Sequence, residues 1–134
     1  MPDGNIQQFL DADTFAVVGA STDRSKYGNK VLRAYQQTQR EVFPINPNAD
    51  KIEGVKAYPN LKSVPKPIQS VSIITPPPIT ENAIDDIIAE GILNVWMQPG
   101  AESTAAIRKA EEAGLNVIAG GPCLLVVAGY REVS

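Results

Sequence analysis

A glycine, two hydroxyl side chains and two cations lie in one short loop, directly after the first apolar run of the chain. The apolar run covers residues 15–18, and the loop contains Gly19, Ser21, Thr22, Arg24 and Lys26. Glycine lets the backbone turn sharply and approach a ligand without a Cβ atom in between. Hydroxyl and backbone N–H groups donate hydrogen bonds to phosphate oxygens, and a helix that begins after the loop adds the positive end of its dipole. The loop is therefore a candidate binding site for a phosphate or pyrophosphate group.

The rest of the chain alternates between strands and helices and predicts an α/β fold. Apolar runs predict strands at about residues 15–18, 41–45, 70–74, 94–97 and 116–119. Helices are expected at about residues 5–10, 27–38, 80–90 and 102–113, with Thr80 as the N-cap of the third and Gly91 as its C′ residue. In the second helix, Val31, Leu32 and Tyr35 form the inward stripe and Arg33 faces outward. Residues 124–127 form a last apolar segment whose pattern favours neither a helix nor a strand.

Such alternation predicts a Rossmann-like domain with three layers and a five-stranded, mainly parallel sheet. The expected strand order is 3-2-1-4-5, which places the switch point between the first and fourth strands. Ligands bind at such a point, outside the carboxyl ends of the strands. We expect one domain over residues 1–134, with a core at about residues 12–127.

Composition excludes several classes of function. The net charge of −3 provides no general basic field, so nucleic acid is not expected as a partner. The absence of histidine excludes Ser-His-Asp and Cys-His catalysis. A single cysteine fits a reducing compartment, and no apolar run could span a membrane, so a cytoplasmic protein is expected.

A dinucleotide cofactor is the main alternative ligand for such a loop. Gly19 matches the first glycine of the G-x-G-x-x-G fingerprint, but Ser21 and Arg24 occupy the second and third positions. The second strand ends in Ile45-Asn46-Pro47, where NAD enzymes place an acidic residue that binds the ribose. An NAD(P)-binding module of an oxidoreductase stays open as an alternative.

Five segments in one unbroken order resemble the CoA-binding domain found in small proteins and in the alpha subunit of succinyl-CoA synthetase. These segments are VVGAS, KYGNKVL, VFPINPN, SVSIITPPP and NVWMQPGAES. The resemblance covers roughly residues 12–127. It implies that coenzyme A is the ligand, but the chain lacks the ligase domain and phosphorylated histidine of the synthetase.

The resemblance also implies site residues. It places Gly19, Ala20, Ser21 and Thr22 around the pyrophosphate, with Arg24 and Lys26 as charge partners, and leaves open whether Tyr27 covers the ligand or packs under its helix. It places Asn46, Pro47 and Lys51 beside the adenosine and its 3′-phosphate. It places Ile74, Thr75, Pro76, Pro77 and Pro78 along the adenine and the start of the pantetheine arm.

The leading hypothesis is thus a non-catalytic protein that binds CoA or an acyl-CoA. An interaction protein with a vestigial pocket is a second alternative, and a homodimer or an unidentified protein partner is possible. Cys123, which follows the fifth strand, is expected to be an inert thiol, although a mixed disulfide with CoA is an alternative.

Overall fold

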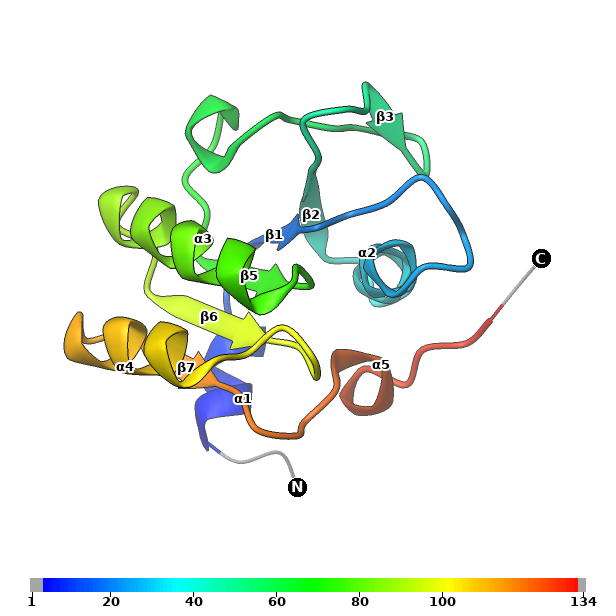
Figure 1. The fold of residues 1–134 in the computed structure, drawn as a ribbon. Helices are drawn as coiled ribbons and strands as arrows, with labels where there is room; N and C mark the ends of the chain where they lie inside the picture. The colour runs from blue at the N-terminus through cyan, green and yellow to red at the C-terminus, as the bar shows by residue number, and fades with distance from the viewer. Residues whose placement is uncertain (1–3, 133–134) are drawn as a thin grey trace.

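Five parallel strands form the central sheet of the structure, a computed structural model that describes residues 4–132. The strands are β1 (Thr14–Val18), β2 (Glu41–Ile45), β5 (Ser70–Ile73), β6 (Asn94–Met97) and β7 (Asn116–Ile118). They lie in the order β2-β1-β5-β6-β7, and every neighbouring pair is parallel (Figure 1). Because every residue of β5 and β6 is buried, both faces of the sheet must be covered.

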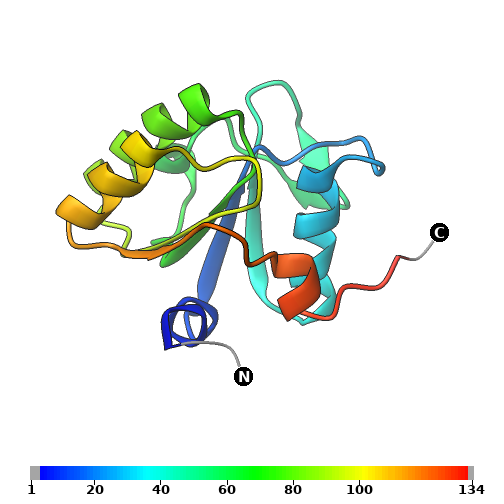
Figure 2. The ribbon, with the colours of Figure 1, turned by 60° about the horizontal axis from the view of Figure 1, so that its bottom comes forward.

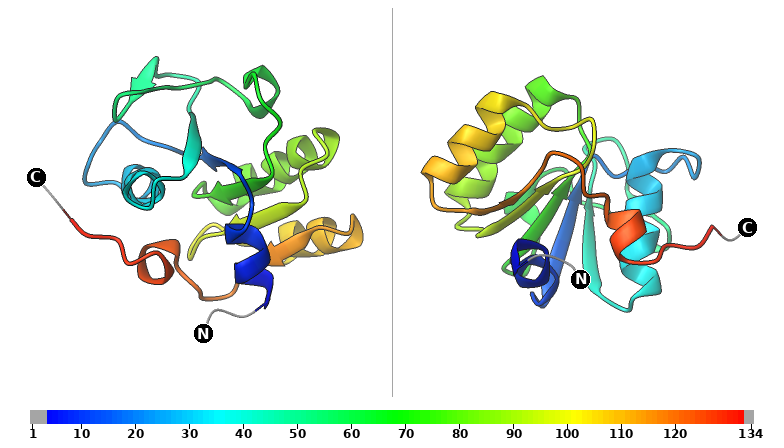
Figure 3. Two further views of the ribbon diagram at one scale, coloured as in Figure 1. Left: turned by 180° about the vertical axis from the view of Figure 1, so that it is seen from behind. Right: turned by 90° about the horizontal axis from the view of Figure 1, so that it is seen from below.

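Helices cover both faces, which gives the three layers predicted from the sequence. One face carries α2 (Tyr27–Gln37) and α5 (Leu124–Val127), and the other carries α3 (Pro77–Ala89) and α4 (Thr104–Glu112) (Figure 2). The short helix α1 (Gly4–Leu10) lies against β6 and β7 (Figure 3). The α/β fold with a parallel sheet of five strands is therefore confirmed.

The predicted strand order 3-2-1-4-5 is wrong, because the strand at residues 70–73 pairs with β1 and not with β2. The connection over residues 46–69 contains a hairpin of β3 (Lys51–Ile52) and β4 (Val55–Lys56) and the 3-10 helix η1 (Leu61–Ser63). Its apolar residues Leu61, Val64 and Ile68 are buried on the face that carries α3, opposite to α2. Right-handed connections on opposite faces run in opposite directions, so this one returns past β1. The switch point consequently lies between β1 and β5.

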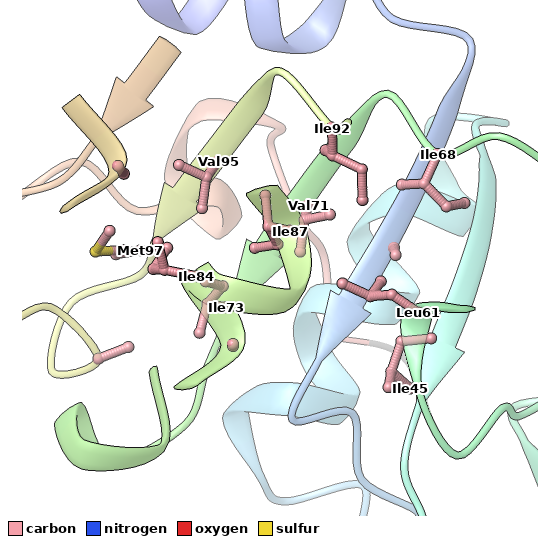
Figure 4. Packing of buried hydrophobic residues seen from close by; sticks show 14 of the residues in the cluster. Ile45, Leu61, Ile68, Val71, Ile73, Ile84, Ile87, Ile92, Val95 and Met97 are labelled. Atoms are coloured by element: carbon pink, nitrogen blue, oxygen red, sulfur yellow. The ribbon is translucent and has the colours of Figure 1, made fainter. Parts of the chain in front are cut away.

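Two hydrophobic cores hold the helices on the sheet. On one face, Ile84 and Ile87 of α3 pack against Val71 and Ile73 of β5, as Figure 4 shows. On the other face an aromatic cluster joins α1, β1, α2 and β6, and its members are Phe9, Phe15, Tyr35 and Trp96. These contacts fix where each strand delivers the loop at its carboxyl end.

Helix α3 begins three residues earlier than predicted. Pro76 is its N-cap residue and Pro77 its first residue, so Thr80 is not the cap. Proline fits this position because the first N–H groups of a helix have no partner within the helix. Gly91 follows the helix with a φ of 72°, as predicted for a C′ residue.

Candidate functional site

The carboxyl ends of β1, β2 and β5 border an open cavity of about 390 Å³, which we call the first cavity. It lies at the switch point between β1 and β5. Sequence-predicted site residues that line it are Gly19, Ala20, Asn46, Pro47 and Thr75. The structure therefore brings together three loops that are far apart in the sequence.

The loop after β1 touches the first turn of α2 so closely that only glycine fits at position 28. A Cβ atom on Gly28 would lie 2.1 Å from the carbonyl oxygen of Gly19 and 3.3 Å from Cα of Ala20. Gly19 has a φ of 95°, and a Cβ atom on it would lie 3.0 Å from the carbonyl oxygen of Ile74. Backbone segments from β1, α2 and β5 therefore meet without side chains between them.

The N-terminus of α2 points its positive dipole end at this loop. Lys26 is the exposed N-cap residue, and among the described residues no side chain caps the first turn, which also contains no acidic residue. Because neither a capping side chain nor a carboxylate of the first turn offsets the positive end of the dipole, an anion beside the loop would be stabilised there.

Hydrogen bonds within the loop define its shape. The Ser21 hydroxyl accepts a bond of 3.0 Å from the Asp23 amide, and the Asp23 carboxylate accepts from the hydroxyl and the amide of Ser25. The bonds from Ser25 lower the pKa of Asp23. Thr22 is exposed at the loop surface. The loop is therefore ordered by its own polar groups, with one carboxylate among its cations.

The two loop cations differ in their surroundings. Arg24 Nε lies 3.5 Å from a carboxylate oxygen of Glu53, which belongs to the β3–β4 turn, and Arg24 does not line the first cavity. Lys26 is exposed beside the start of α2. Of the two predicted charge partners for a phosphate, Lys26 is thus the one whose side chain makes no ion pair among the described residues.

Asn46 connects the exit of β2 to the loop after β1. Its side-chain amide donates a bond of 2.9 Å to the carbonyl oxygen of Ala20, and its side-chain oxygen accepts from the amide of Asn48. No carboxylate follows β2 at this point; the acidic residue among those lining the first cavity is Asp86, which comes from α3. The ribose-binding arrangement of NAD enzymes is therefore missing.

A second cavity of about 410 Å³ adjoins the loop that follows β5. Thr75 lines both cavities, and Ile74, Pro76 and Pro77 line the second together with residues 99–101. The hydroxyl of Thr80 donates to the carbonyl oxygen of Thr75 at 3.2 Å, which holds this loop against the start of α3. Pro78 is exposed in the first turn of α3 and lines neither cavity.

The hairpin beyond Asn46 presents two opposed lysines. Lys51 is exposed and lies directly across the β3–β4 pair from Lys56, whose Nζ atom is 5.3 Å from the ring centroid of Tyr58. Like charges in opposed positions of an antiparallel pair are unfavourable. An anion near this hairpin would reduce that repulsion.

Tyr27 packs beneath the loops and lines neither cavity. Its half-buried hydroxyl lies 3.1 Å from Oε1 of Gln98 and 2.6 Å from Sγ of Cys123. Burial, and the hydrogen bond to the thiol, raise the pKa of Tyr27, so the phenol is protonated at neutral pH. Gln98 also accepts from the Leu124 amide at 2.9 Å, which ties α5 to the end of β6. Tyr27 therefore packs between the start of α2, the end of β6 and the residue before α5.

Several lining residues escaped the sequence reasoning. The first cavity is also lined by Asn60, the N-cap residue of η1, and by three residues of α3, namely Asn82, Asp86 and the half-exposed apolar Ile79. Ile79 and Asp86 follow the proline segment in the sequence, and this position was the available signal that they border the site. Their side chains are exposed like those of an ordinary solvated helix face, so nothing else in the sequence distinguishes them. Gly28 had a clearer signal, because glycine is unfavourable inside a helix.

Within residues 4–132, no helix is both long and apolar enough to cross a membrane. The same part of the chain contains no cluster of three or more His, Cys, Asp or Glu residues that could hold a metal ion.

The comparisons with known proteins agree with this geometry. A family model described as a CoA binding domain matches residues 13–129. A solved conserved hypothetical protein from Pyrococcus furiosus is 35% identical, with a TM-score of 0.81 over 87% of this chain and 99% of its own. An uncharacterized protein from Bacillus subtilis is 29% identical over 77% of this chain and 76% of its own.

Two longer relatives are named as a CoA ligase subunit and an acetyl-coenzyme A synthetase. The alpha subunit of an ADP-forming acetate–CoA ligase from Pyrococcus furiosus is 28% identical over 85% of this chain. An acetyl-coenzyme A synthetase from Candidatus Korarchaeum cryptofilum, solved with phosphate and ADP, is 32% identical with a TM-score of 0.72 over 80% of this chain. This chain spans 25% of the length of each. Because the family model matches nearly the whole chain, the protein belongs to the CoA binding domain family.

Proposed function

We propose that this protein binds coenzyme A, or an acyl-CoA, at the carboxyl ends of its strands and catalyses no reaction by itself. The observation that carries the proposal is the convergence of Gly19, Asn46 and Thr75 on the first cavity. These residues come from the three loops that the family resemblance assigned to the ligand.

The parts of the site match the parts of CoA. The loop after β1 and the uncapped start of α2 suit the pyrophosphate, because backbone N–H groups and a helix dipole both favour an anion. The first cavity suits the adenosine, and the proline segment shared with the second cavity suits the weakly polar pantetheine arm. The opposed Lys51 and Lys56 suit the 3′-phosphate.

The absence of catalysis is proposed from the chain's chemistry. Its sequence contains no histidine, so neither Ser-His-Asp nor Cys-His catalysis is available to it. The proposed role is therefore to hold a CoA ligand. A cytoplasmic location is proposed with it, because the chain has a single cysteine.

Titration calorimetry with CoA, dephospho-CoA and NAD tests the ligand. CoA is expected to bind most tightly. Dephospho-CoA is expected to bind about tenfold more weakly, because a charge-assisted contact contributes about 1.5 kcal/mol. NAD binding that equals or exceeds CoA binding, or the absence of CoA binding, rejects the proposal.

A variant pair separates the 3′-phosphate contact from general charge effects. Lys51→Ala is expected to reduce the preference for CoA over dephospho-CoA, because Lys56 alone then faces the 3′-phosphate, and to leave dephospho-CoA binding unchanged. Arg108→Ala removes an exposed cation from α4 and serves as the matched control, with no expected effect on either ligand. If Lys51→Ala weakens the binding of CoA and of dephospho-CoA equally, Lys51 does not contact the 3′-phosphate.

A further inference from the structure

Two buried polar side chains of α2 hold the backbone of the loop after β1 from behind. Asn29 is fully buried and Arg33 is 5% exposed, one helical turn further on. Polar side chains that are buried to this extent almost always form hydrogen bonds to other protein groups. Most of the hydrogen bonds that these two side chains donate go to groups outside their own helix, which indicates that they organise those groups.

Asn29 acts on the first half of the loop. Its side-chain amide donates to the carbonyl oxygen of Ser21 at 2.9 Å and to Oε2 of Glu53 at 3.0 Å. Because the peptide unit is planar and trans, fixing the Ser21 carbonyl toward α2 directs the next amide, that of Thr22, to the opposite side. One side chain thereby sets the direction of a loop N–H group.

Arg33 acts on the second half of the loop. Its Nη2 atom donates to the carbonyl oxygen of Arg24 at 2.9 Å, and its Nε atom donates to Oδ1 of Asn29 at 2.7 Å. A planar guanidinium can bridge three acceptors at fixed angles, which the flexible ammonium group of lysine cannot reproduce. The expectation that Arg33 faces solvent is therefore wrong, and the reason is that these acceptors enclose it.

The C-terminal segment completes the arrangement. Nη1 of Arg33 donates to Oε2 of Glu132 at 2.7 Å, and the guanidinium lies 5.5 Å from the ring centroid of Tyr130. A buried cation is costly unless it is paired. Glu132 provides the paired carboxylate and also lies 3.7 Å from Nζ of Lys30. The tail thus covers the arginine that holds the loop.

We infer that Asn29 and Arg33 are positioning residues that hold residues 21–24 in the shape that binds the phosphate groups of the ligand, with Glu132 pairing the arginine. Neither side chain lines the first or second cavity, so each acts through the loop and not by touching the ligand. The affinity part of this inference rests on the proposed function. The part that concerns the loop does not, because the hydrogen bonds exist without a ligand.

The rate of trypsin cleavage measures how firmly the loop is held in the absence of a ligand, because trypsin cleaves after Arg24 and Lys26, which lie in the loop. Cleavage after these residues is expected to be at least tenfold faster in Asn29→Ala and in Arg33→Lys than in the unmodified protein. Arg33→Lys keeps the positive charge and loses the planar guanidinium that bridges three acceptors. This variant therefore still tests the inference if Asn29→Ala does not fold.

Asn94→Ala is the matched control for the loss of a buried asparagine. Asn94 is 8% exposed at the start of β6, at the opposite end of the sheet, and donates to the carbonyl oxygen of Gln69 at 3.0 Å. Its loss is expected to reduce stability and to leave cleavage after Arg24 and Lys26 unchanged. Equal acceleration in this control would mean that general unfolding causes the cleavage, and would overturn the inference.

Calorimetry with CoA then connects the loop to the site. Asn29→Ala and Arg33→Lys are expected to weaken CoA binding at least tenfold, while Asn94→Ala leaves it unchanged. If the unmodified protein does not bind CoA, the proposed function fails and the cleavage rates still decide whether the loop is held. If the unmodified protein binds CoA and the variants bind it equally well, the inference is overturned, whatever their cleavage rates.

Discussion

Replacing Gly28 with alanine tests most directly whether the close contact between α2 and the loop after β1 matters for the ligand. The added Cβ atom would lie 2.1 Å from the carbonyl oxygen of Gly19 and 3.1 Å from its carbonyl carbon. Real Cβ atoms do not approach other atoms closer than about 3 Å, so the loop and the helix must separate. The neighbour is backbone, which cannot rotate away as a flexible side chain could.

Two opposing effects determine the stability of Gly28→Ala. Alanine is favoured over glycine in a helix by up to about 1 kcal/mol. Forcing an extra carbon into a packed contact costs about 1–3 kcal/mol. We expect a net loss of about 1–2 kcal/mol in the free energy of unfolding, measured in urea.

The effect on binding is larger. A binding site has to be held within about 0.5 Å of its productive geometry, and the required separation exceeds this. The loss of one charge-assisted hydrogen bond costs about 1.5–3 kcal/mol, which corresponds to about 10- to 150-fold weaker binding of CoA. Titration calorimetry on the folded variant measures it.

Gly114→Ala is the control for this prediction. Gly114 ends α4 with a φ of 83°, and a Cβ atom there would meet nothing within 4 Å. Left-handed backbone costs a non-glycine residue about 1–2 kcal/mol, so the two variants lose similar stability. Only Gly28→Ala is expected to lose CoA affinity. Equal CoA affinities in the two variants would refute the argument that this contact shapes the ligand site.

Three further predictions concern the α5 attachment, the tail and the thiol. Gln98→Leu leaves two donors of α2 and α5 without their acceptor and is expected to lower the free energy of unfolding in urea by about 1–3 kcal/mol. The Tyr130 hydroxyl and Arg33 lower the pKa of Glu132 below its ordinary 4.5, so the tail contact is fully present above about pH 4.5 and is lost as the pH falls through the lowered pKa. A carboxyl NMR titration should show this midpoint rise in Tyr130→Phe; an unchanged midpoint would contradict it. Cys123 is expected to form no adduct with CoA disulfide by intact mass, and an adduct that disappears in Cys123→Ser would contradict this.

Local signals predicted the part of the site that a single stretch of chain builds. The apolar run before Gly19, the polar loop and the amphipathic start of α2 are consecutive, and strand, loop and helix occur where expected. Gly28 lies in the same stretch but outside the dinucleotide fingerprint, whose last position is 24. The cost of glycine inside a helix was the available signal.

The strand order depended on information that no local pattern contains. Residues 46–69 include no regular helix, so their periodicity does not indicate which face of the sheet they cover. Leu61, Val64 and Ile68 pack beside α3, and that choice of face sends the chain back past β1. The loops after β1 and β5 are nevertheless neighbours in the observed order, and Gly19, Ala20 and Thr75 from these loops line the first cavity.

Arg33 shows why a buried polar group is hard to recognise from periodicity. On α2 it lies beside the apolar stripe, and an arginine there is normally solvated. It is buried because Glu132, which lies 99 residues further along the chain, and the nearby Tyr130 cover that side of the helix. Burial strengthens its hydrogen bond to the Arg24 carbonyl oxygen, because water cannot replace this acceptor around a shielded guanidinium. A residue that holds a binding loop in place can therefore depend on a distant segment of the chain for its burial, and local sequence patterns do not reveal such a residue.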